Sequence, residues 1–168
     1  MLPTHRLKIV LVEPEIPQNT GNIARLCAAS GAALHLVRPL GFFLTDKHFK
    51  RAGMDYLASL PITLHDSVDA LFAAIGGDPF LLSSGVAGCP HWDASFTPDT
   101  WILLGKESAG LPASLLQRYP ERTCRIPMIE GTRGLNLSTA AGILLYEGLG
   151  RLARSSGDSD CNQRPTLT

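Results

Sequence analysis

Three groups of residues combine polar or charged side chains with glycine or proline. They are residues 19–25 (NTGNIAR), residues 104–112 (LGKESAGLP), and residues 126–128 (IPM) together with 134–138 (GLNLS). Arginine can bind a phosphate or a developing oxyanion, and asparagine amides can order the surrounding loops by hydrogen bonding. Glycine lets the backbone come close to a flat ligand or turn sharply. These residue types favour a site for a nucleotide-like ligand.

The usual phosphate-binding and hydrolase motifs are missing from the sequence. No GxxxxGK[ST] string is present, no complete GxGxxG follows an expected strand, and no GxSxG string occurs. These absences disfavour nucleotide triphosphatases, dinucleotide-dependent enzymes and hydrolases of the GxSxG type. The four cysteines contain no CxxC pair and have no histidine at a metal-ligand spacing. We therefore expect reduced thiols and no metal site.

Length and composition predict one folded domain. The chain has 168 residues, of which 45% are hydrophobic and 18% charged, so a full core can form. The formal net charge of zero argues mildly against a long non-specific RNA-binding surface, although a local basic patch is compatible with it. The apolar run before Glu13 is too short for a signal peptide, and no run approaches a membrane span. We expect a cytoplasmic protein that does not enter a membrane.

The hydrophobic pattern predicts an α/β fold. Strands are expected at residues 7–12, 34–37, 61–64, 80–83, 101–104 and 124–127, and helices at about 23–30, 46–53, 66–75, 112–118 and 137–154. The first forty residues form a strand–loop–helix–strand unit, which implies parallel strands. Residues 16–22 and 85–98 are expected to be loops. Residues 1–154 form the expected domain, and the polar residues 155–168 form an expected disordered tail.

This arrangement predicts where the three groups meet. The carboxyl ends of parallel strands lie at one edge of a sheet, where ligands bind in open α/β folds. Four loops at such ends have polar or glycine character, at residues 13–22, 83–88, 105–112 and 126–136. We expect them to surround the ligand.

In this order and spacing, the three groups resemble the signature motifs of the SPOUT RNA 2′-O-methyltransferases. The resemblance covers about residues 7–153, and residues 13–17 (EPEIP) and 51–56 (RAGMDY) are similar to the TrmL (YibK) branch, which methylates the wobble cytidine or uridine, position 34, of leucine tRNAs. The resemblance implies a parallel sheet flanked by helices with a deep C-terminal trefoil knot. It also implies S-adenosylmethionine as cofactor, tRNA as partner, and a homodimer that completes the site across its interface.

The resemblance also implies roles for individual residues. The cofactor-binding positions that it implies are Leu82, Ser83, Gly105, Ile126, Gly134 and Leu135. The catalytic set that it implies is Arg25, Asn19, Glu107, Asn136 and Ser138. Without the resemblance, the glycines could serve turns only, the asparagines and Ser138 could cap helices, and Arg25 could be an ordinary surface arginine.

Arg25 is the residue on which the expected chemistry depends most. The resemblance assigns it to activating the ribose 2′-hydroxyl. A guanidinium keeps its proton at ordinary pH, so we expect it to bind the neighbouring phosphate and stabilise the developing oxyanion rather than remove the proton. Methyl transfer from a sulfonium needs in-line placement more than activation, and it needs no metal.

Two alternatives stay open at this point. A related enzyme of the same class could modify another nucleotide of tRNA or ribosomal RNA, or the chain could be a non-catalytic RNA-binding module that keeps the fold. The joint presence of Arg25, Glu107, Asn136 and Ser138 favours an enzyme. Lys106 departs from the pattern, because relatives often have proline there. Small residues in the last helix permit close packing, within the chain or across a dimer interface.

Overall fold

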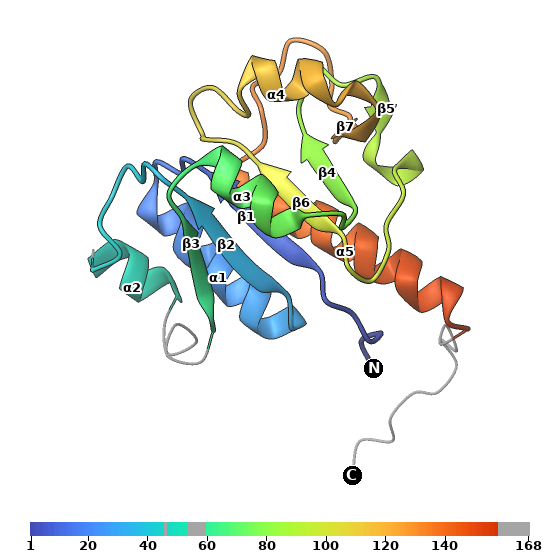
Figure 1. Cartoon of the computed structure of the whole chain (residues 1–168), viewed down its shortest axis with the longest axis horizontal. Coiled ribbons are helices and arrows are strands. Elements are labelled where there is room, and N and C mark those ends of the chain that lie inside the picture. The colour runs from blue at the N-terminus through green and yellow to red at the C-terminus, as the bar shows by residue number, and fades with distance from the viewer. Residues whose placement is uncertain (46, 54–59, 158–168) are drawn as a thin grey trace.

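A parallel β-sheet forms the centre of the molecule in the computed structural model, which describes residues 1–45, 47–53 and 60–157 (Figure 1). In the described residues, seven strands lie side by side in the order β3-β2-β1-β6-β4-β7-β5. Their bounds are β1 Lys8–Val12, β2 Ala33–Val37, β3 Ile62–His65, β4 Phe80–Ser83, β5 Cys89–Pro90, β6 Trp101–Leu104 and β7 Thr123–Arg125. Every pairing is parallel, so the expected α/β fold with a parallel sheet is confirmed.

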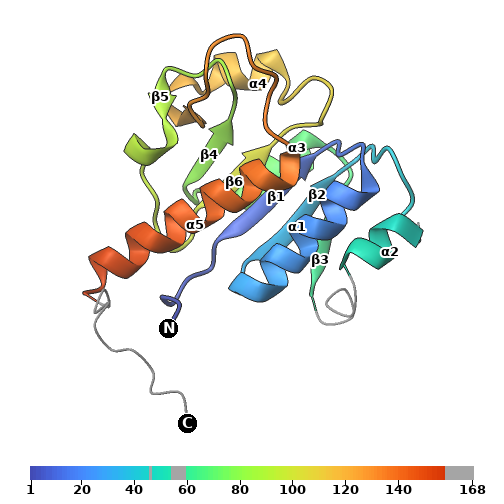
Figure 2. The same cartoon turned by 180° about the vertical axis from the view of Figure 1, so that it is seen from behind.

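Helices cover both faces of the sheet. Their bounds are α1 Pro17–Ser30, α2 Lys47–Gly53, α3 Val68–Ile75, α4 Ala113–Arg118 and α5 Leu137–Ser155, with short 3₁₀ turns at η2 His91–Asp93 and η3 Pro120–Arg122. Figure 2 shows α1 and the long α5 on one face, and Figure 1 shows α3 and α4 on the other. None of the helices in the described ranges is long and apolar enough to cross a membrane.

The strands alternate between two hydrophobic cores. In β1, Ile9 and Leu11 pack with α1 and α5, whereas Val10 and Val12 pack with α3 and α4. A parallel sheet covered by helices on both faces buries both sides of its strands, which therefore appear in the sequence as continuous apolar runs. This is why the strand positions could be read from the sequence.

The expected start of the first helix was wrong. Residues 16–22 were expected to be a loop, but α1 begins at Pro17, and Asn19 and Thr20 are buried within it. Ile16 stands at the N-cap position without a side-chain cap, so neither Asn19 nor Asn22 caps this helix. The expected end of this helix near residue 30 is confirmed, and Gly31 at the C-cap adopts a left-handed conformation with φ of 81°.

Two smaller differences concern the other end of the sheet. Residues 85–98 were expected to be a loop, but they contain the two-residue strand β5, in which Cys89 pairs with Cys124 of β7. A strand of two residues is too short to show alternation. The last strand ends at Arg125, before Ile126. At the C-terminus α5 includes Ser155, and residues 158–168 of the expected tail lie outside the described residues, as do residues 54–56 of the second TrmL-like segment.

Candidate cofactor and substrate site

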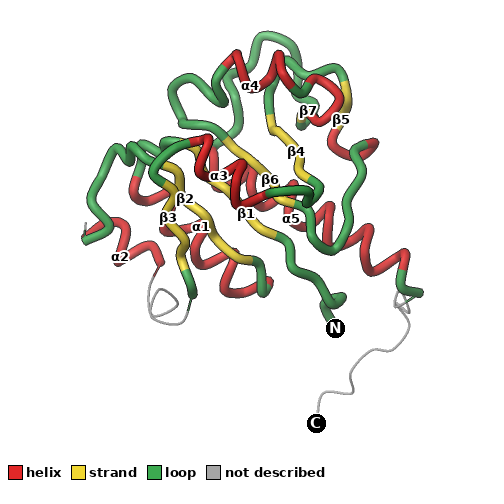
Figure 3. Tube along the Cα trace, in the orientation of Figure 1, coloured by secondary structure: helices red, strands yellow, loops and turns green. Residues whose placement is uncertain are grey.

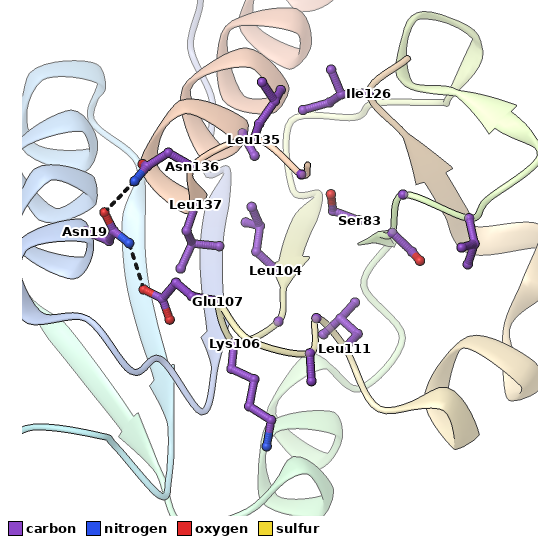
Figure 4. Close-up of a pocket in the computed structure, with 18 of the residues that line it drawn as sticks. Asn19, Ser83, Leu104, Lys106, Glu107, Leu111, Ile126, Leu135, Asn136 and Leu137 are labelled. Carbon is purple, nitrogen blue, oxygen red and sulfur yellow. Dashed lines mark hydrogen bonds between the residues drawn. The ribbon is translucent and has the colours of Figure 1, made fainter. Parts of the chain in front are cut away.

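A pocket of about 660 Å³ lies at the carboxyl ends of the central strands (Figure 4). In Figure 3 the loops that follow these strands are green and the strands themselves are yellow. The volume is within the range of sites for small molecules and cofactors. Among the expected cofactor residues, the pocket is lined by Ser83, Gly105, Ile126, Gly134 and Leu135. Among the expected catalytic residues, it is lined by Asn19, Glu107 and Asn136. The expected convergence of the loops is therefore what the structure shows.

Leu82, Arg25 and Ser138 lie elsewhere. The Leu82 side chain is fully buried in the core beneath α3 and α4 and does not line the pocket. Arg25 is exposed on α1, on the side away from the buried Ile23 and Cys27. Ser138 lies in the first turn of α5, where its side chain bonds to Asn136. The structure thus separates the pocket from the residue expected to act on the substrate.

Gly105 is required by the protein's own backbone. A Cβ atom at this position would lie 1.9 Å from the carbonyl carbon of Gly110. The loop folds back here, because Gly110 N–H donates to the Lys106 carbonyl at 2.8 Å. Glycine is therefore needed to close this turn, and the turn forms part of the pocket wall.

One side chain joins the three sequence motifs. Asn19 Nδ2 donates to Glu107 Oε1 at 2.9 Å, and Asn136 Nδ2 donates to Asn19 Oδ1 at 2.9 Å (Figure 4). Asn136 also caps α5, since its Oδ1 accepts from the Ser138 N–H at 2.9 Å and the Ser138 hydroxyl at 2.7 Å. Asn19 is buried, so both the N–H₂ group and the oxygen of its side-chain amide depend on these partners.

Glu107 explains why α1 begins earlier than expected. Its carboxylate accepts hydrogen bonds from the backbone N–H of Glu15 at 2.8 Å and of Ile16 at 3.3 Å. These N–H groups precede the helix, where a negative charge is favoured by the helix dipole. The cap therefore comes from another loop, and local sequence could not reveal it. Pro17 at the first helical position was the one local signal.

Two further contacts join the same loops, and sequence reasoning missed them. Glu15 accepts from the Ser108 N–H and the Ser108 hydroxyl, both at 2.8 Å, and these hydrogen bonds lower the pKa of Glu15. Lys106 Nζ lies 2.9 Å from Glu13 Oε2, and this bond raises the pKa of Lys106. Lys106, where the resemblance led us to expect proline, thus forms an ion pair at the pocket rim.

The composition of the pocket suits a flat, partly apolar ligand, as an adenosyl group is. Leu104, Leu111 and Leu116 supply apolar wall, whereas Ser83 and Ser84 supply hydroxyl groups. Apolar surfaces suit a flat base, and a few polar groups fix its orientation. Gly85 and Gly134 line the wall at positions where a Cβ would meet no protein atom within 4 Å. Within the described part of the chain, no group of three or more His, Cys, Asp or Glu side chains could hold a metal ion.

Comparison with known sequences gives consistent matches. A family model described as the SpoU rRNA Methylase family matches residues 6–146. The tRNA (cytidine(34)-2′-O)-methyltransferase of Burkholderia ambifaria is 45% identical over 143 residues, which cover 83% of this chain and 91% of that protein. The protein of the same name from Methylovorus glucosotrophus is 44% identical over 140 residues, with coverage of 83% and 91%.

Solved structures agree with the sequence matches. A structure described as giving insights into the 2-OH methylation of C/U34 on tRNA has a TM-score of 0.84 and 42% sequence identity, and the match covers 92% of this chain and 99% of that one. The SpoU methyltransferase AviRb from Streptomyces viridochromogenes, solved in complex with the cofactor AdoMet, has a TM-score of 0.77 and 27% identity. That match covers 90% of this chain and 59% of the AviRb chain.

Proposed function

Since this chain belongs to the SpoU methylase family, we propose that it transfers a methyl group from S-adenosylmethionine to the ribose 2′-hydroxyl of the wobble nucleotide, cytidine or uridine 34, of a tRNA. The observation that carries this proposal is the pocket in which the three motifs meet around Asn19. The names of the relatives support the wobble nucleotide. Leucine isoacceptors are the tRNAs that we propose, and the cytoplasm is the proposed place of action.

The cofactor would lie between the loop at residues 105–111 and the loop at residues 126–136. It supplies an electrophilic methyl group on a positively charged sulfur. Ser83, Gly105, Ile126, Gly134 and Leu135 are the residues proposed to hold it, partly through backbone groups. Leu82 could contribute only through its backbone, because its side chain is buried in the core and does not line the pocket.

The protein's part in the reaction is placement and charge stabilisation. The Asn19–Glu107–Asn136 connection holds the two pocket loops and α1 in fixed relation, which favours in-line attack. Arg25 would bind the phosphate beside the target ribose and stabilise the 2′-oxygen as negative charge develops. The hydroxyl proton would pass to solvent, because a guanidinium is a poor proton acceptor.

The deep trefoil knot of the family belongs to this proposal. Support comes from the match to the SpoU methylase family, and the loops at residues 105–111 and 126–136, which line one pocket, are the segments that it would involve. The hydrogen bond from Asn136 to Asn19 further fixes the end of the second loop against α1. This arrangement is consistent with a chain end that passes through a knot.

We also propose a homodimer formed through α1 and α5, which pack beside each other (Figure 2). Arg25 and Ala29 of α1 are exposed, as is Tyr146 of α5. A Cβ at Gly142 of α5 would meet nothing within 4 Å, so this helix face is open to a partner. Gly148 has a different role, because its Cβ would lie 2.8 Å from Phe96 of the same chain. A dimer would let Arg25 serve the pocket of the other protomer.

The proposal is tested by methylating tRNA transcripts with labelled S-adenosylmethionine and mapping the modified nucleotide. Label on the ribose of nucleotide 34 in leucine tRNAs is the expected result. Label on another nucleotide would overturn the wobble assignment but keep the chemistry. Cofactor binding without transfer to any tRNA would favour an RNA-binding module, and absence of cofactor binding in calorimetric titration would contradict the proposal as a whole.

A further inference from the structure

Glu15 connects two loops of the site without lining the pocket. It follows β1, whereas its partner Ser108 follows β6, and the two strands are neighbours in the sheet. Glu15 Oε2 accepts from the Ser108 N–H and Oε1 from the Ser108 hydroxyl, both at 2.8 Å. One carboxylate therefore holds both the backbone and the side chain of Ser108. Hydrogen bonds to an ionised acceptor are stronger than those between neutral groups.

The connection runs in both directions. Glu107, the residue before Ser108, accepts from the Glu15 N–H at 2.8 Å. Each loop thus supplies a carboxylate that binds the backbone N–H of the other. Lys106 and Glu13 add an ion pair of 2.9 Å between the same two loops. Neither loop can shift along the sheet edge without breaking several charge-assisted hydrogen bonds.

The backbone of the segment that contains Glu15 is held in place by Gly41. Gly41 N–H donates to the Pro14 carbonyl at 2.9 Å. A Cβ at Gly41 would lie 2.7 Å from the Glu15 Cα, so the two backbones are in close contact. Glu13 has a φ of 52°, which is uncommon for a residue other than glycine and fixes the direction in which the chain leaves β1. Glu15 is therefore presented to Ser108 from a supported backbone.

The loop that Glu15 holds has few supports of its own at its tip. Ser108, Ala109 and Gly110 are exposed. The turn is closed by the hydrogen bond from Gly110 to Lys106, and Ser108 donates both its N–H and its hydroxyl to Glu15. Gly105 and Gly110, at the two ends of this turn, line the pocket. A change in the position of Ser108 would therefore be felt directly in the pocket wall.

From this geometry we propose that Glu15 is a positioning residue for the cofactor: through Ser108 it holds residues 105–110 in the conformation that binds S-adenosylmethionine. The inference rests on the proposed function. It assigns Glu15 an effect on cofactor affinity rather than on the reacting atoms, because the carboxylate lies outside the pocket wall. Glu107, by contrast, lines the pocket and holds α1.

The test is the nearly isosteric variant Glu15→Gln in the full chain. The amide oxygen can still accept from the Ser108 N–H, and the amide N–H₂ group can donate to the Ser108 hydroxyl, so both bonds can persist but lose the negative charge that strengthens them. We expect the Kd for S-adenosylmethionine in calorimetric titration, and the KM for it in tRNA methylation, to rise about 10-fold, the scale of replacing two charge-assisted hydrogen bonds by neutral ones. The kcat at saturating cofactor should change less than about twofold, since no transition-state contact is removed.

Two further variants separate positioning from general damage. Ser108→Ala removes only the hydroxyl partner and should raise the Kd by a smaller factor. The double variant should bind the cofactor at most about twofold more weakly than Glu15→Gln alone. The effects of two residues that act through the same contact do not add. Glu121→Gln, at an exposed glutamate of η3, is the matched control and should bind cofactor like the wild type.

Wild-type affinity in Glu15→Gln would overturn the inference, as would a fall in kcat at saturation as large as the loss of affinity. Additive effects of the two substitutions would also contradict it, because Glu15 would then not act through Ser108. If the wild-type protein itself fails to bind S-adenosylmethionine, the proposed function fails first and this inference fails with it. Should Glu15→Gln not fold, Ser108→Ala alone decides, and unchanged affinity in that variant would contradict the proposal.

Discussion

Asn19 and Asn136 lie 117 positions apart in the chain and are joined by a hydrogen bond of 2.9 Å from Asn136 Nδ2 to Asn19 Oδ1. Because the Asn19 oxygen accepts this bond, its nitrogen must face Glu107, to which it donates at 2.9 Å. Asn19 therefore has a hydrogen-bond donor on one side and an acceptor on the other. The amide offers a donor and an acceptor side by side, whereas an ionised carboxylate of the same shape can only accept.

We predict that Asn19→Asp destabilises the fold and that Glu107→Gln partly rescues it. The new carboxylate would lie beside the Glu107 carboxylate in a buried position, so the free energy of unfolding should fall by about 1–3 kcal/mol. Glutamine at position 107 would restore a donor–acceptor pair. Urea denaturation of the two single variants and the double variant measures the coupling. A double variant as unstable as the sum of the single changes would contradict the proposed contact.

For Arg25, we predict that substitution by alanine lowers kcat about 10²–10³-fold, the scale of losing one oxyanion-stabilising group. Cofactor affinity should be unchanged, since Arg25 does not line the pocket. Arg25→Lys should recover only part of the rate, because lysine lacks the two-pronged geometry. Single-turnover methylation and calorimetric titration give the two quantities.

The matched control for Arg25 is Arg6→Ala. Arg6 is an exposed arginine that precedes β1, at the opposite end of this strand from the pocket, where it pairs with Asp99. The Arg6→Ala variant should methylate tRNA at the wild-type rate. A wild-type rate in Arg25→Ala would show that Arg25 is an ordinary surface residue, and full activity in Arg25→Lys would show that charge alone is sufficient.

We predict that Gly142→Arg converts a dimer into a monomer. The position is open within the protomer, and arginine favours a helix more than glycine does, so the fold itself should tolerate the change. Sedimentation should give a mass near twice the chain mass of 18.0 kDa for the wild type and near 18.0 kDa for the variant, together with loss of methylation. Gly77→Arg, at another position without a neighbour within 4 Å, is the control. An active wild-type monomer would contradict the shared site.

A histidine pair on the α3 face of the sheet predicts a pH dependence of stability. His35 Nδ1 lies 2.9 Å from His65 Nε2, and Trp101 packs against His35. Burial, then His65 and Lys8, lower the pKa of His35 to about 4 from 6.5. The native state thus favours the neutral ring, so its contribution is complete above pH 6.5 and is lost as the pH falls toward 4.

Between pH 7 and 4.5, the wild type should lose ~1–2 kcal/mol more stability than His35→Gln, after allowance for solvent screening of this half-buried ring. Urea denaturation at several pH values measures the difference. Parallel pH profiles for the wild type and His35→Gln would refute the assignment.

The sequence predicted those parts of the fold and site that depend on local pattern. The strands were recognisable because both of their faces are buried, as with Ile9 and Val10 of β1. The pocket residues could be grouped because loops at the carboxyl ends of parallel strands must converge. The first turns of α1 were missed because their cap comes from Glu107, and the bond between Glu15 and Ser108 was missed because it joins residues 93 positions apart. The spacing of hydrophobic residues along the chain carries no information about a side-chain contact between such distant positions.

The order in which the pocket is built has a consequence for the newly made chain. Most of the sheet can form before residues 126–155 leave the ribosome, but Ile126, Leu135 and Asn136, which close one side of the pocket, belong to that later segment. The partner of the Asn19 oxygen is likewise absent until Asn136 has been synthesised. A growing chain therefore has a sheet before it has a site, and cofactor cannot stabilise it during most of its synthesis. Until α5 is made, the nascent chain lacks both the complete site and the part of the hydrophobic core that Leu144, Leu145 and Leu149 supply.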